Sequence, residues 1–279
     1  MCTDGHRCEH CPARRVAGGA RVVAQALPAL GMVVTATANA AALLSHTGEY
    51  LPPAFPGEAL SCGADRIALR LHPGRIADIH LTPRALTLAD ASGTHRAYFT
   101  PRSDPMLIEA IALAPAAPPE PETPLRWSEL DWRDTDQITH LDALTTERYH
   151  VLPFTGARRV EPRVLPHLLA HLADLSLPFT VAVPGGGCLQ LHRDRAALVE
   201  HEPDHVSVVF GAARYAVSPL HIRECWLTHS HGPTGVTSAL ELYDHDNRCV
   251  TVLTQTGSIC PHLHGAWEAI AASLPDPGA

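Results

Sequence analysis

The sequence lacks the features of several large protein classes. No apolar run approaches the roughly 18 residues that suggest a membrane-spanning helix, and the first residues show no basic stretch followed by an apolar one, as a secretion signal would. Lys and Arg number 21 against 29 Asp and Glu, so the formal net charge is −8 with His neutral. General binding to nucleic acid or anionic membranes needs a basic face. We therefore expect a cytoplasmic protein that neither crosses a membrane nor binds nucleic acid.

Motifs of common enzyme classes are missing as well. The sequence has no glycine-rich nucleotide loop, no Walker motif and no Gly-x-Ser-x-Gly nucleophile elbow. It therefore offers no catalytic constellation of its own, and redox chemistry would have to come from a bound cofactor.

The composition is that of a globular protein with many metal-binding side chains. The 279 residues are 46% hydrophobic, which suffices for two domains with a sizeable core. Eight Cys in a chain without a secretion signal are expected to stay reduced. The 19 His permit a metal, haem or pH-linked role, and the alternative is that they fill surface positions.

Sulfur and nitrogen donors cluster within residues 1–16, which we predict to form a Cys/His-rich tail. Cys8 and Cys11 form a Cys-x2-Cys half-site of the kind that binds zinc. A second half-site is absent, so a tail with incidental metal affinity is the alternative. The donors that could hold zinc are Cys2, His6, Cys8, His10 and Cys11.

Two segments of the chain repeat at nearly constant offsets. Residues 85–100 and 239–254 share Ala, two Leu, Asp and the closing Thr in register at an offset of 154, and both read as a β-hairpin. Residues 76–82 parallel 222–228 at an offset of 146, and a longer loop explains the difference. We infer that the chain is a duplicated unit.

The boundary between the repeats is predicted at residues 114–124, where five prolines favour an extended linker. The first repeat then spans residues 17–113 and the second residues 125–279. Each half reads as a helix, many antiparallel strands and a second helix, which predicts an α+β fold of two similar halves. The expected helices cover residues 17–30, 106–113, 134–149, 165–175 and 266–274.

Several short runs are similar to those of one known family. Gly187 to His192 reads Gly-Cys-Leu-Gln-Leu-His, and Val236 to Asp244 reads Val-Thr-Ser-Ala-Leu-Glu-Leu-Tyr-Asp. They resemble the Gly-Cys-Ile-Gln-Ile-His and Val-Thr-Ser-Leu-Glu-Leu-Phe-Asp runs of the HemS/ChuX family of haem-utilisation proteins, also called hemin-degrading factors. The first half adds Leu27-Pro28-Ala29-Leu30-Gly31, Thr37-x-Asn39, Gly48-x-Tyr50 and Thr100-x-x-Ser103-Asp104.

The chain thus resembles a divergent member of this family. The resemblance implies two antiparallel-sheet halves with haem in a cleft between sheet and helices. The family's axial ligand is a His in a Thr-Asp-Val-His pattern, and here His140 follows Thr135-Asp136 two positions late. His140 is the first candidate for the iron ligand and His192 the second. Arg70, in a Leu-Arg-Leu run that resembles the family's, is the candidate for a haem propionate or the distal face.

Three functions stay open at this point. The first is a cytoplasmic haem-binding protein that carries haem between an importer and a receiving protein, or degrades it as a haem oxygenase does. The second is a zinc protein that uses the Cys/His-rich termini. The third is a degenerate family member without a haem ligand, because basic residues of the family are replaced, as at His231-Gly232-Pro233.

Overall fold

The computed structural model describes residues 13–55, 58, 62–118, 157–232, 235–256 and 260–278. Within these ranges no helix is both long and apolar enough to cross a membrane.

The first half begins with a short strand and a helix, continues with six strands, and ends with a helix. Short 3-10 turns at Leu27–Ala29 and Pro73–Arg75 connect elements within it. The elements are β1 (Arg14–Arg15), α1 (Gly19–Ala26), β2 (Gly31–Asn39), β3 (Ala42–Tyr50), β4 (Arg66–Leu71), β5 (Asp78–Leu81), β6 (Ala85–Ala89), β7 (Gly93–Ser103) and α2 (Pro105–Ala112).

The second half repeats this order with two more strands. Its 3-10 turns lie at Pro162–Val164 and Pro219–His221. The elements are β8 (Arg158–Val160), α6 (Leu165–Asp174), β9 (Phe179–Gly185), β10 (Cys188–Asp194), β11 (Leu198–His201), β12 (Val206–Val209), β13 (Ala213–Val217), β14 (Glu224–Gly232), β15 (Gly235–Tyr243), β16 (Cys249–Thr254) and α7 (Pro261–Ser273).

Local sequence explains where the helices begin and end. Asp104 caps α2, because its carboxylate accepts the backbone N–H groups of Met106 at 2.8 Å and Leu107 at 3.2 Å. The first predicted helix is shorter than expected, since Pro28 closes it in a 3-10 turn. The last helix starts five residues earlier than predicted, at Pro261 rather than 266, because proline suits the first helical position. The predicted helix over 134–149 lies outside the described residues.

The strands form one continuous sheet in which each half repeats the same strand order. In the first half β5, β6, β7, β2 and β3 are neighbours, and in the second half β14, β15, β16, β9 and β10 follow the same sequence. Both predicted hairpins are present, as the pairs β6–β7 and β15–β16. The prediction of an α+β fold with two similar halves is confirmed.

The two halves are joined by strand pairing at two places. β13 of the second half pairs with β3 of the first, and β4 of the first pairs with β10 of the second, all antiparallel. The two pairings have equivalent registers. Ala42 of β3 pairs with Val217 of β13, and the residues 146 positions away from them in the other half, Cys188 of β10 and Leu71 of β4, also pair with each other. A pseudo-twofold axis therefore runs between β3 and β10. The boundary between the repeats at residues 114–124 stays a prediction.

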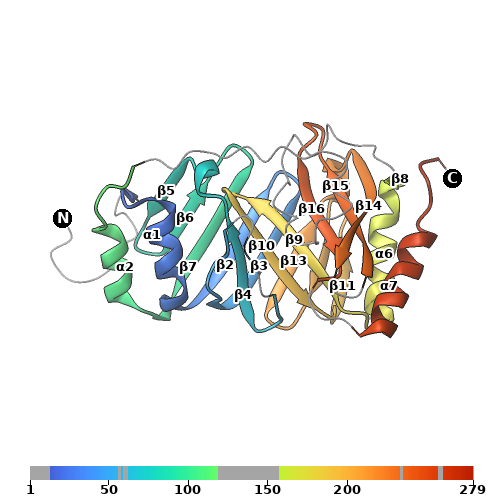
Figure 1. Cartoon of the computed structure of the whole chain (residues 1–279), viewed down its shortest axis with the longest axis horizontal. Coiled ribbons are helices and arrows are strands. Elements are labelled where there is room, and N and C mark those ends of the chain that lie inside the picture. The colour runs from blue at the N-terminus through green and yellow to red at the C-terminus, as the bar shows by residue number, and fades with distance from the viewer. Residues whose placement is uncertain are drawn as a thin grey trace.

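Figure 1 shows the strands in the middle of the molecule, with α1 and α2 at one end and α6 and α7 at the other. The largest core cluster joins α6 and α7 to the second-half strands, and it includes Leu44 from β3. The second cluster joins α1 and α2 to the first-half strands and includes Cys188 from β10. Each core thus contains a side chain from the other half. The buried leucines of α6 are Leu165, Leu168, Leu169 and Leu172, whose spacing is that of one helix face, while Leu175 is half exposed.

Asp90, in the turn of the first hairpin, ties this turn to the second half. Its carboxylate accepts the backbone N–H groups of Gly187 at 2.6 Å and Gly186 at 3.2 Å, as well as those of Ser92 and Gly93 at 2.7 and 2.8 Å. One side chain therefore satisfies donors from both halves, and two of these donors belong to buried glycines.

We expect Asp90→Ala to lower the free energy of unfolding by about 2–4 kcal/mol, because it leaves buried N–H groups without acceptors. Urea unfolding of the variant measures this loss. The matched control is Asp244→Ala in the second hairpin, where the carboxylate accepts only the nearby N–H groups of Asp246 and Arg248, both at 2.9 Å. Equal losses for the two variants would contradict a role for Asp90 in joining the halves.

Candidate functional site

The predicted residue His192 lies on β10 and its ring contacts that of His46 on β3. The offset between them is 146 residues, so they occupy equivalent positions on β10 and β3. Their rings meet edge to face with centroids 4.9 Å apart, and the ring of Phe210 lies 4.8 Å from that of His192. His192 is fully buried and His46 is 1% exposed. Within the described structure, none of the four ring nitrogens has a hydrogen-bond partner.

Burial sets the charge of this pair. Burial and, to a smaller extent, the neighbouring His46 lower the pKa of His192 to about 4, while the charge of Asp194 acts in the opposite direction. Burial also lowers the pKa of His46, against the charge of Asp65. Both imidazoles are therefore neutral near pH 7 and keep a free nitrogen lone pair, which is the form that binds a metal.

A second polar cluster lies beside the pair and is fully hydrogen-bonded. The Nδ1 of His95 contacts the hydroxyl of Thr37 at 2.7 Å, and its Nε2 contacts the hydroxyl of Tyr50 at 2.8 Å. Thr37 also donates to the side-chain oxygen of Gln190 at 2.7 Å, and the amide of Gln190 donates to Thr35 at 3.1 Å. This network connects strands of both halves, so its polar groups fix how the halves fit together.

The network also explains two of the sequence motifs. Tyr50 ends the Gly48-x-Tyr50 motif, and Gln190 lies within the Gly187 to His192 run. Burial raises the pKa of Tyr50 and lowers that of His95 to about 3, so both are uncharged. Sequence reasoning missed His46 and His95, although the repeat offset that relates His46 to His192 was present in the sequence.

Arg70 is completely buried on β4. Its guanidinium donates to the backbone carbonyls of Phe55 at 3.0 Å and Glu58 at 2.6 Å, so it holds the segment that follows β3. The adjacent His72 has its pKa lowered to about 3 by burial and by the charges of Arg75 and Arg70. A contact between Arg70 and haem stays a prediction.

The remaining predicted site residues are not placed by the structure. His140 and the tail residues Cys2, His6, Cys8 and Cys11 lie outside the described residues. Within the described ranges no cysteine forms a disulfide; these cysteines are Cys62, Cys188, Cys225, Cys249 and Cys260.

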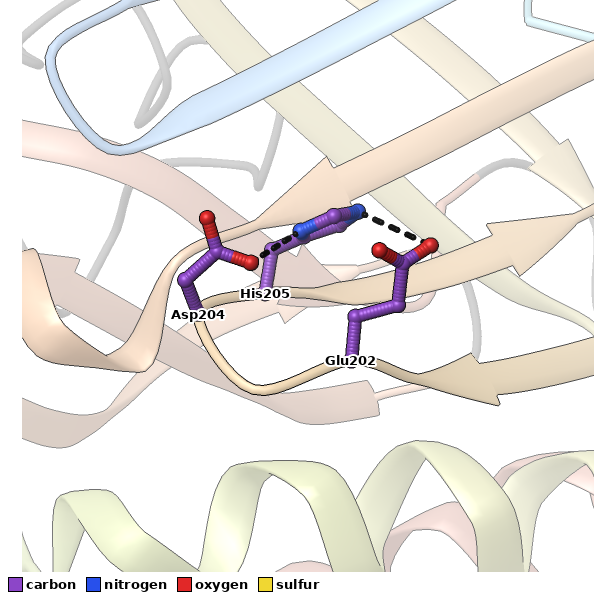
Figure 2. A group of neighbouring side chains, drawn as sticks. All are labelled: Glu202, Asp204 and His205. Carbon is purple, nitrogen blue, oxygen red and sulfur yellow. Dashed lines mark hydrogen bonds and ion pairs between the residues drawn. The ribbon is translucent and has the colours of Figure 1, made fainter.

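An exposed group of possible metal ligands lies in the turn between β11 and β12. Figure 2 shows the ring of His205 between the carboxylates of Asp204 and Glu202, at 2.8 and 3.5 Å. Its hydrogen bond with Asp204 raises the pKa of His205 and lowers that of Asp204. All three polar groups are thus occupied with one another at the surface, which is a common arrangement without an ion.

No family model and no curated protein matches this sequence. Among solved structures, the fold is similar to that of holo-PhuS, described as a heme-binding protein from Pseudomonas aeruginosa, with a TM-score of 0.71 and 18% identity over 95% of this chain and 87% of that one. It is also similar to ChuS of Escherichia coli O157:H7, described as a heme degrading enzyme, with a TM-score of 0.75 and 19% identity over 96% and 88% of the two chains. A second structure of E. coli ChuS, described as a heme oxygenase, has a TM-score of 0.74 and 19% identity over 94% of this chain and 88% of that one. The chain therefore has the two-repeat fold of PhuS and ChuS along nearly its whole length, the fold that its sequence motifs predicted.

Proposed function

We propose that this protein binds haem and acts in haem and iron utilisation. The observation that carries the proposal is the fold shared over 95% of the chain with PhuS, a heme-binding protein, and over 96% with ChuS, a heme degrading enzyme. The sequence motifs also support it, because the runs Gly187 to His192 and Val236 to Asp244 resemble runs of haem-utilisation proteins. The protein would act in the cytoplasm, exchanging haem with an importer or a receiving protein.

His140 is the axial ligand we propose. His192 ranks second because its ring is covered by His46 and Phe210, so iron could reach it only if these contacts opened. Arg70 ranks as a secondary contact for haem, since two backbone carbonyls already accept from its guanidinium. A neutral His in an apolar slot, with cations for the propionates, is the chemistry that haem binding needs.

Titration of the purified protein with hemin under reducing conditions tests the proposal. We expect a saturable shift of the Soret band at one haem per chain. His140→Ala is expected to weaken binding at least tenfold, which corresponds to about 1.4 kcal/mol. The matched control is His167→Ala, which removes an exposed His of α6 and should leave the titration unchanged.

Each outcome of the titration has a clear meaning. The absence of a saturable shift would contradict haem binding and favour a family member that has lost its ligand. Loss of the shift in His192→Ala, with His140→Ala unchanged, would exchange the order of the two ligands. Addition of ascorbate and O₂ to the complex then separates degradation, in which the Soret band disappears, from transport, in which it persists.

A further inference from the structure

The strands β7, β2, β3 and β13 are neighbours in the sheet, and one of their two faces is open to solvent. The burial of the side chains alternates along these strands, as expected when the opposite face meets the core. The face that is turned away from the core is here called the outer patch. It consists of Val34, Ala36 and Ala38 on β2, Leu43, Ser45 and Thr47 on β3, Arg96 and Tyr98 on β7, and Arg214 and Ala216 on β13.

The outer patch differs from its counterpart in the second half. The pairs of residues related by the repeat offsets of 146 and 154 are Val34 and Thr180, Leu43 and Leu189, and Tyr98 and Val252. The three side chains of the first half are between 36% and 40% exposed, and their three counterparts are between 0% and 2% exposed. The same face of the repeat is thus buried in one half and bare in the other, so this face is one that the fold is able to cover.

The side chains of the outer patch are short in its middle and long at its sides. Alanine, serine and other small or medium residues of β2 and β3 form a floor, and arginines lie beside it on β7 and β13. Arg96 pairs with Ala36, Ala36 with Ser45, and Ser45 with Arg214, so the two arginines lie in one row across the strands. Three strand spacings separate them, which is about 14 Å. An α-helix with its side chains is about 10–12 Å wide and therefore fits between them.

The outer patch is positively charged, whereas the whole chain has a net charge of −8. It contains two arginines and no carboxylate, and among the described residues no acidic side chain forms an ion pair with Arg96 or Arg214. Other carboxylates of this sheet pair with arginines outside the patch: Asp78 with Arg15 at 3.4 Å and Glu49 with Arg66 at 3.7 Å. Glu200 lies two strands beyond β13, on β11. The patch therefore suits a ligand with a carboxylate on each side of an apolar strip.

We propose that the outer patch binds an acidic amphipathic helix of a partner protein. The apolar side of the helix covers Val34, Ala36 and Leu43, and Glu or Asp side chains on its two flanks pair with Arg96 and Arg214. A second copy of this chain does not complement the same face, because two outer patches packed on each other bring four arginines together without a carboxylate. The contact spans part of four strands, which is the size of a transient interface.

Fluorescence anisotropy with a designed peptide tests the proposal on the full-length protein. The probe is a fluorescein-labelled, lactam-stapled helix of about 18 residues, with Leu and Ala on one side and Glu along both flanks of that side. We expect saturable binding of this Glu peptide, and binding at least about tenfold weaker when Gln replaces the flanking Glu. The double variant Arg96→Glu, Arg214→Glu is expected to bind the Glu peptide at least about 30-fold more weakly than the wild type. The matched control is Arg163→Glu, which reverses an exposed arginine in the turn before α6 and should bind as the wild type does.

A charge-swapped pair separates a lost contact from a misfolded variant. The double variant is expected to bind a peptide with Lys in place of the flanking Glu, which an unfolded chain would not do. Equal affinity of the double variant and the wild type for the Glu peptide would overturn the proposal. So would the absence of saturable binding to the wild type up to about 1 mM peptide.

Sedimentation velocity without peptide tests the other occupant of the outer patch. We expect the wild type and Leu43→Asp to sediment alike. A wild-type dimer that Leu43→Asp dissociates would show that a second copy of the chain covers this face, and would overturn the proposal. None of these outcomes depends on whether haem binds.

Discussion

Lowering the pH from 7 to 5 is expected to destabilise the protein by about 2 kcal/mol for each of two buried histidines, His95 and His72. Burial lowers the pKa of both to about 3, and the charges of Arg75 and Arg70 contribute at His72. In the unfolded chain each histidine titrates near pH 6.5. The folded pKa is below the unfolded one, so the stabilisation is complete above pH 6.5 and is lost as the pH falls toward 3.

Urea unfolding between pH 7.5 and 5, with a chelator present, measures this effect. The variant His95→Gln removes one titrating group while keeping polar atoms for Thr37 and Tyr50. It should lose about 2 kcal/mol less than the wild type between pH 7 and 5, although it is less stable at pH 7. His167→Gln, at an exposed site, is the control that should follow the wild-type curve. Parallel curves for wild type and His95→Gln would show that His95 titrates normally in the fold.

The sequence predicted the repeated fold but not the exchange of strands between halves. Residues 66–71 alternate in a way that indicates a strand, and the repeat offsets place its counterpart in the second half. Alternation specifies which side chains of a strand face the core, and it leaves the partner strand open. The pairing of β4 with β10 depends on contacts between residues about 120 positions apart, such as Ala68 and Leu191, and local pattern does not encode them.

The candidate site was predictable in part. His192 was identified from its motif, and the offset of 146 could have led from it to His46. The resemblance of Leu69-Arg70-Leu71 to a run of the family predicts Arg70 as a contact for haem, and the alternative is an ordinary surface arginine. The structure buries it against the carbonyls of Phe55 and Glu58, an interaction between a side chain and a loop backbone that has no sequence signature.

The turn at Gly186, which Asp90 holds, leaves no room for a side chain, and Gly186→Ala is expected to cost more than about 4 kcal/mol of folding free energy. The residue has φ +68°, a left-handed conformation that favours glycine. A Cβ atom there would lie 2.6 Å from the backbone nitrogen of His95 and would also overlap the carbonyl oxygen of Leu88. Both obstacles are backbone atoms of the first half, so relief of the overlap requires the two halves to separate.

Gly265→Ala in α7 is the matched control, because nothing lies within 4 Å of its Cβ position and alanine stabilises a helix by about 0.5–1 kcal/mol relative to glycine. Urea unfolding of both variants decides the matter: if Gly186→Ala were as stable as the wild type, the close approach of the second-half turn to β6 and β7 would not exist in solution.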